Sequence, residues 1–174
     1  QLLIERLARP ATQAPLADYT ITLVEGVVRC WSEINEMLST YSQGWTVERE
    51  AIPGETNGYT TTDGTRRVVV DADLSPAQAA KTALHEAAHV ILHAEQDAAE
   101  YVQHRGVTET EAESVAYVVA GILGLDTSAY SIGYVAGWSN GEPETIKATA
   151  ANVLRAAHTL ADAITEPAEE SDAA

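Results

Sequence analysis

Apolar residues recur at every third or fourth position in three stretches of the chain, a spacing typical of helices that pack one face against a core. The stretches cover about residues 18–42, 75–95 and 108–123. In the first stretch the apolar stripe consists of Leu23, Val27, Trp31, Ile34 and Leu38. A fourth helix is expected from Glu142, just before a proline, to about Ile164.

Alternating residues over Trp45–Arg49 predict a strand instead. Two more strands are expected over Tyr59–Thr62 and Thr65–Val70, because the Asp63-Gly64 pair between them is a strong signal for a two-residue hairpin turn. The three strands would form a small antiparallel sheet packed on the helix over residues 75–95. We therefore expect an α+β fold in which a three-stranded sheet covers a helical bundle.

Local signals indicate where the helices begin and end. The helix over residues 75–95 has an N-cap serine, a proline at its first position and a glutamine three residues after the cap: Ser75, Pro76 and Gln78. Thr108 and Glu111 form a capping box, so another helix is expected to begin there and to end at Gly124. The polar residues 96–107 are expected to form a loop, and residues 131–138 a short helix.

Composition divides the chain into a linker over residues 1–17, one domain over residues 18–165 and an acidic, disordered tail over residues 166–174. The formal net charge is −16, so this domain is not expected to bind nucleic acid directly. Cys30 is the only cysteine, which excludes an internal disulfide. Since the sequence contains no signal peptide and no long apolar run, we expect a cytoplasmic protein that does not enter a membrane.

The helix over residues 75–95 carries the pattern His-Glu-x-x-His at His85, Glu86 and His89. Two histidines four residues apart on a helix lie about 6 Å apart on one face, so both imidazoles can reach one metal ion. Glu86 then lies beside the open side of that ion, where it can act as general base on a bound water. This is the zinc hydrolase arrangement, and Zn²⁺ is the expected cofactor. The alternative, a core site without a metal, would bury three polar side chains at considerable cost.

A third metal ligand is expected from the helix that begins near Thr108. Glu109 lies three residues before Ala112 on the buried face of that helix, and Glu113 lies one turn further on. We assign Glu109 as the ligand and Glu113 as the acceptor that orients a ligand histidine, with the reverse assignment left open. Glu111 lies off this face and is expected to point to solvent as a capping residue.

His93 continues the four-residue spacing of the motif, but a straight helix places it about 12 Å from His85. One ion cannot take all three histidines, so His93 is expected to be a packing residue or a bystander. Several other side chains could stabilise an oxyanion, and none is assigned that role: His104, His158, Tyr130 and Tyr134.

Two motifs within residues 18–165 resemble those of ImmA/IrrE-type metallopeptidases: Lys81–His89 and Glu109–Tyr117. The stretches Gly124–Ser131 and Tyr134–Trp138 resemble more specifically the C-terminal peptidase domain of actinobacterial and phage antirestriction proteins of the ArdC type. The resemblance implies a zincin-like fold. It also implies a single-stranded-DNA-binding domain ahead of the peptidase domain in the full protein, and no such domain is present in this chain.

The same resemblance implies that His85, His89 and Glu109 bind zinc, that Glu86 is catalytic, and that Glu113 fills a position where family members carry Asn or an acid. We therefore expect a zinc metallopeptidase that hydrolyses a peptide bond in a peptide or protein substrate, in an antirestriction or mobile-element and phage regulatory role. The alternative is a binding module in which the zinc site is structural or catalytically silent. The substrate and the oligomeric state stay open.

Overall fold

The computed structural model describes residues 31, 33–39, 44–96 and 98–165. The elements follow in the order β1 (Thr46–Glu50), β2 (Gly58–Thr60), β3 (Arg67–Asp71), α3 (Pro76–His93), α4 (Ala98–Ile122), α5 (Ser128–Trp138) and α6 (Pro143–Thr165). Residues 33–39 are also helical, within the helix expected over residues 18–42. The α+β class is thus confirmed. The linker over residues 1–17 and the tail over residues 166–174 lie outside the described residues.

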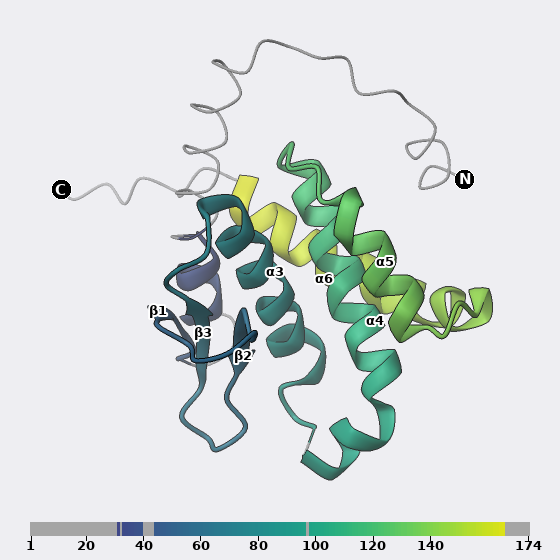
Figure 1. Cartoon of the computed structure of the whole chain (residues 1–174), viewed down its shortest axis with the longest axis horizontal. Helices are drawn as coiled ribbons and strands as arrows, with labels where there is room; N and C mark the ends of the chain where they lie inside the picture. The colour runs from purple at the N-terminus through teal and green to yellow at the C-terminus, as the bar shows by residue number, and fades with distance from the viewer. Residues whose placement is uncertain (1–30, 32, 40–43, 97, 166–174) are drawn as a thin grey trace, which may run out of the picture.

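The sheet and the helical bundle meet at α3, which lies between them (Figure 1). One side of α3 contacts β2 and β3, and another side contacts α4 and α6. Most residues of its buried face are alanines: Ala79, Ala80, Ala83, Ala87 and Ala88. Because such small side chains let neighbouring elements approach closely, polar groups on α3 lie within reach of both the sheet and α4.

The strand order is β1-β3-β2, and the sheet is mixed rather than antiparallel as predicted. β2 pairs antiparallel to β3, but β1 pairs parallel to β3, with Val47 opposite Val68. The central strand contains a continuous apolar run, Val68–Val70, that is fully buried. Such a run favours a position paired on both edges, and β3 lies between the two strands that precede it, parallel to β1 and antiparallel to β2.

The β2–β3 connection is longer than the predicted two-residue turn, because β2 ends at Thr60 and β3 begins only at Arg67. Within this connection the Asp63 carboxylate accepts a hydrogen bond of 3.0 Å from the backbone N–H of Thr65. Gly64 has a φ of +85°, in the left-handed region that glycine adopts without strain. The predicted antiparallel pairing of β2 with β3 is confirmed, whereas the predicted two-residue turn between them is wrong.

The predicted start of α3 is confirmed: the Ser75 side chain accepts from the backbone N–H of Gln78, and Pro76 is the first helical residue. The short helix expected near residues 131–138 corresponds to α5, and the last predicted helix corresponds to α6.

The expected loop over residues 96–107 does not exist, because α4 begins at Ala98 and runs without a break to Ile122. The Thr108 hydroxyl donates to the carbonyl oxygen of His104 one turn earlier, as a residue inside a helix does, instead of capping a helix start. Gly106 is compatible with the helix and leaves room for α5, since a Cβ atom there would lie 3.0 Å from the Trp138 carbonyl oxygen. No helix in the described part of the chain, α4 included, has the apolar length needed for a membrane span.

Candidate metal centre

His85 and His89 lie one helical turn apart on α3 and direct the same ring atom toward one point. Their Nε2 atoms are 3.1 Å apart, and their ring centroids are 4.8 Å apart with the planes at 75°. Only 15% of the His85 side chain and 11% of the His89 side chain are exposed. Two imidazole nitrogens held at this separation are suited to share one ion, as their spacing in the sequence predicted.

α4 brings Glu109 to the same point. Its Oε2 atom lies 3.4 Å from Nε2 of His85, and its Oε1 atom lies 3.8 Å from Nε2 of His89. Ligand atoms of the three residues all lie within 4.8 Å of one another, which makes them a possible metal-binding group. Two imidazoles and one carboxylate form the donor set of many catalytic zinc sites, so the residues fit the expected ion.

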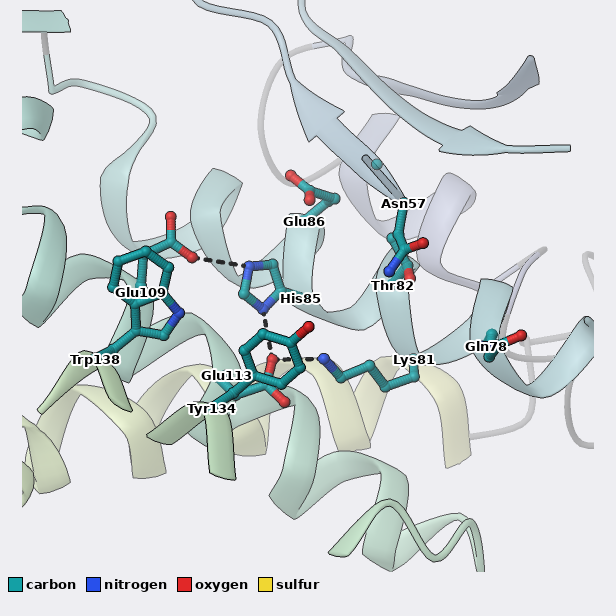
Figure 2. Close-up of a pocket in the computed structure, with 11 residues that line it drawn as sticks. Asn57, Gln78, Lys81, Thr82, His85, Glu86, Glu109, Glu113, Tyr134 and Trp138 are labelled. Atoms are coloured by element: carbon teal, nitrogen blue, oxygen red, sulfur yellow. Dashed lines mark hydrogen bonds and ion pairs between the residues drawn. The ribbon is translucent and has the colours of Figure 1, made fainter. Parts of the chain in front are cut away.

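Glu113 lies on the other side of the His85 ring from Glu109 (Figure 2). Its Oε2 atom is 3.1 Å from Nδ1 of His85 and accepts a hydrogen bond of 2.5 Å from Lys81. Burial raises the pKa of Glu113, but the contacts with His85 and Lys81 together have the larger effect and lower it to about 2. Glu109 therefore faces the two Nε2 atoms, whereas Glu113 contacts the nitrogen of His85 that points away from them.

The two histidines differ in their electrostatic surroundings. Burial lowers the pKa of His85, but its contacts with Glu109 and Glu113 raise it more, to about 9. Burial and the nearby charge of His85 lower the pKa of His89 to about 3. Burial also raises the pKa of Glu109, although hydrogen bonds with His85 and Tyr101 lower it to about 2. The protein groups alone thus place one imidazolium against ionised carboxylates, a setting that also suits a divalent cation.

Tyr101 on α4 is a site residue that the sequence analysis missed. Its hydroxyl donates a hydrogen bond to Oε1 of Glu109, and its ring lies edge-on to His89 with centroids 6.4 Å apart. Burial and the Glu109 carboxylate raise the pKa of Tyr101 to about 12, so the phenol keeps its proton. The four-residue spacing of Tyr101, Arg105 and Glu109 would have placed them on one face, had residues 96–107 been assigned to a helix.

Glu86 is buried beside the sheet, with 7% of the residue exposed. Its Oε2 atom accepts a hydrogen bond of 2.8 Å from the Thr60 hydroxyl on β2. Burial raises the pKa of Glu86. β2 approaches α3 this closely because Gly58 has no side chain: a Cβ atom there would lie 2.6 Å from Cγ2 of Thr82 and 2.9 Å from the Val69 carbonyl oxygen.

Glu111 is buried, and the prediction that it points to solvent is wrong. Its Oε2 atom lies 2.8 Å from Nε2 of His93, and its Oε1 atom accepts a hydrogen bond of 2.7 Å from Asn152 on α6. His93 also contacts His89, with 3.3 Å between their Nδ1 atoms. Glu111 is interior because its partners come from α3 and α6, which a local capping signal cannot reveal.

Two cavities adjoin the site and share four lining residues: Gly58, His85, Glu86 and Glu109. The smaller, of about 370 Å³, is also lined by Lys81, Tyr134 and Trp138. The larger, of about 610 Å³, is also lined by Thr60, His89, Tyr101 and Arg105. Of the residues considered for an oxyanion, Tyr134 lines the smaller cavity, whereas His104 and His158 are exposed and line neither. The Tyr130 side chain lies outside the described part of the chain.

The sequence model of the family Peptidase_M78, described as the IrrE N-terminal-like domain, matches residues 42–134, which hold all the site residues above except Trp138 and Asn152. Short segments are similar to transcription antitermination protein NusB. The NusB of Beutenbergia cavernae is 50% identical over 48 residues, which are 28% of this chain and 31% of that protein. The NusB of Bifidobacterium animalis subsp. lactis is 46% identical over 48 residues, again 28% and 31%.

These matches span about a third of the length of the curated relatives, too little of either chain to establish membership of that family. No solved structure matches the chain.

Proposed function

Since the chain belongs to the Peptidase_M78 family of IrrE N-terminal-like domains, we propose that it is a zinc-dependent metallopeptidase. The metal ligands in this proposal are His85, His89 and Glu109, and the general base is Glu86. The observation that carries the proposal is the convergence of three ligand atoms within 4.8 Å beside a buried glutamate. Glu113 accepts from Nδ1 of His85 and so holds its Nε2 atom toward the ligand position.

A bound zinc ion supplies a Lewis acid that polarises a carbonyl and makes water a stronger nucleophile. The Glu86 carboxylate takes a proton from the attacking water and returns it to the nitrogen of the leaving amine. In this proposal Oε1 of Glu86 takes the proton, since Oε2 already accepts the hydrogen bond from Thr60. The cluster has three ligand residues within the described part of the chain, the number typical of catalytic zinc sites, whereas structural sites have four. This count supports an enzyme over the alternative of a structural zinc in a binding module.

The proposed substrate is a peptide or protein chain bound along β2. This strand lies at the edge of the sheet, and both cavities reach Gly58 at its start. An extended substrate can pair with such an edge through backbone hydrogen bonds, which would set its carbonyl groups beside Glu86. The net charge of −16 supports a protein substrate over a nucleic acid. For the biological setting we propose antirestriction or phage regulation, supported by the resemblance of the stretches Gly124–Ser131 and Tyr134–Trp138.

The proposal is tested with a library of proteome-derived peptides and mass spectrometry of the new termini. Cleavage is expected from the zinc-loaded protein and is expected to disappear in the Glu86→Gln variant and after chelation. The Glu86→Gln protein should bind zinc like the parent, because none of the three ligands has changed. If the parent and Glu86→Gln proteins, both zinc-loaded, yield the same set of termini, the proposed function is wrong.

A further inference from the structure

His93 connects the proposed metal ligand His89 to a buried carboxylate. The two histidines are one turn apart on α3, with 3.3 Å between their Nδ1 atoms. On its other side, Nε2 of His93 lies 2.8 Å from Oε2 of Glu111. Only 6% of the His93 side chain and 7% of the Glu111 side chain are exposed. Both ring nitrogens of His93 are therefore occupied by protein groups, which differs from a histidine that merely fills space.

Glu111, His93 and His89 form a row of hydrogen bonds, and the groups at its two ends determine which atom donates in each bond. The Glu111 carboxylate accepts at Oε1 from the Asn152 amide, and at Oε2 it can accept the Nε2–H of His93. A neutral His93 with its proton on Nε2 has a lone pair on Nδ1, which then accepts from the Nδ1–H of His89. With its proton on Nδ1, His89 presents an unprotonated Nε2, which is the atom that faces His85 and Glu109.

At the Glu111 end, this row of hydrogen bonds continues to a residue on another helix. Asn152 lies on α6, and its Oδ1 atom accepts a hydrogen bond of 3.2 Å from Arg155. His85 has a different arrangement, because its Nδ1 atom contacts the Glu113 carboxylate directly at 3.1 Å. The two histidines of the motif are thus oriented by separate carboxylates, one directly and the other through an intervening imidazole.

We propose that His93 and Glu111 are positioning residues that fix the tautomer and the ring orientation of His89 and thereby raise the metal affinity of the site. This inference rests on the proposed function, since it assigns His89 as a metal ligand. Groups that orient a metal-bound histidine typically contribute 10–100-fold in metal affinity. His93 itself is not a ligand here, because its Nε2 atom is directed at Glu111.

The test compares His93→Leu with His93→Asn. Leucine removes both hydrogen bonds, whereas the Oδ1 atom of asparagine can take the place of Nδ1 and still accept from His89. Zinc affinity is measured by competition with a chromophoric chelator, and the site is also loaded with Co²⁺ to record its visible absorption spectrum. His93→Leu is expected to bind zinc 10–100-fold more weakly and to change the Co²⁺ spectrum. His93→Asn keeps an acceptor for His89 but loses the contact with Glu111, so it is expected to lose clearly less affinity than His93→Leu.

The exposed His158 supplies a matched control, since His158→Leu makes the same change outside the site. Circular dichroism of each metal-free variant verifies folding. If His93→Leu does not fold, Glu111→Ala tests the proposed role of the His93–Glu111 pair and should weaken zinc binding about tenfold. Equal losses of zinc affinity in His93→Leu and His93→Asn would overturn the proposal that His93 and Glu111 position His89. Parental zinc affinity in His93→Leu would overturn it as well. Those results leave the proposed metal site intact. A parent protein that binds no zinc would overturn the proposed function itself.

Discussion

The Thr60 hydroxyl donates a hydrogen bond of 2.8 Å to Oε2 of Glu86, so the edge strand of the sheet holds the proposed general base directly. Glu86 must be ionised to accept a proton. Burial raises the pKa of Glu86, and the bond from Thr60 lowers it in part. The Thr60→Val variant loses this bond while keeping the shape of the side chain, so the pKa of Glu86 should rise further.

Activity of Thr60→Val is therefore expected to fall at acidic pH and to recover as the pH increases, with the acidic limb of kcat/KM displaced to higher pH. The measurement is a pH profile of peptide cleavage for parent and variant. Thr46→Val on β1, where the hydroxyl bonds Glu48 at the opposite edge of the sheet, is the control and should keep the parental profile. A displacement to lower pH would contradict the assigned role of Thr60.

Replacing Glu86 by glutamine should separate metal binding from hydrolysis. Glutamine has nearly the same shape but cannot take a proton from water, and a positioned general base typically contributes 10²–10⁴-fold to the rate. We expect kcat of Glu86→Gln to fall by about this factor while the zinc content, measured by atomic absorption, equals that of the parent. A loss of zinc together with activity would indicate that Glu86 acts as a ligand instead.

Gly58→Ala should destabilise the protein by about 1–3 kcal/mol, the usual cost of adding a methyl group to a tightly packed contact. The new Cβ atom would meet Cγ2 of Thr82 at 2.6 Å and the Val69 carbonyl oxygen at 2.9 Å, so β2 must move away from α3. Unfolding in urea measures the change in free energy. Gly133→Ala on α5 is the matched control, because nothing lies within 4 Å of its Cβ position.

In the control, alanine should stabilise α5 by up to about 1 kcal/mol, since it is the better helix former. Opposite signs for the same chemical change would show that close packing of β2, rather than loss of a glycine as such, causes the defect. A neutral Gly58→Ala variant would contradict the contact between β2 and α3.

Zinc should stabilise the folded chain against heat. A ligand at 100 times its dissociation constant contributes about 2.7 kcal/mol, which for a protein of this size corresponds to about 5–10 °C in Tm. Differential scanning calorimetry with and without added Zn²⁺ measures the shift. His85→Ala should abolish most of it, whereas His158→Ala, on the exposed face of α6, should retain it. An undiminished shift in His85→Ala would place the bound ion elsewhere.

Features that depend on neighbours in the sequence were predictable. The start of α3 follows from Ser75 and Pro76, and the pairing of His85 with His89 follows from helical spacing alone. Even Glu109 could be placed, because its offset from Ala112 gives the direction of its side chain on a helix. These inferences need only the geometry of one element.

The predictions that were wrong concern features that depend on contacts between distant segments. Glu111 is buried because His93 and Asn152, on two other helices, satisfy its carboxylate. β1 pairs with β3 instead of β2 because the most apolar strand takes the centre of the sheet, and the pairing is parallel. Tyr101 was missed for a related reason: polar residues around Gly106 suggested a loop, although packing of α4 on α5 keeps this segment helical.

Because α4 is continuous, the contact between Tyr101 and Glu109 depends on the number of residues between them. Tyr101 and Glu109 are eight positions apart, slightly more than two turns. A single inserted residue between them would rotate Tyr101 by about 100° around the axis and carry its hydroxyl away from the carboxylate. A loop would absorb such an insertion. A substitution within this segment therefore leaves the helical register intact, whereas a change in its length breaks the contact between Tyr101 and Glu109.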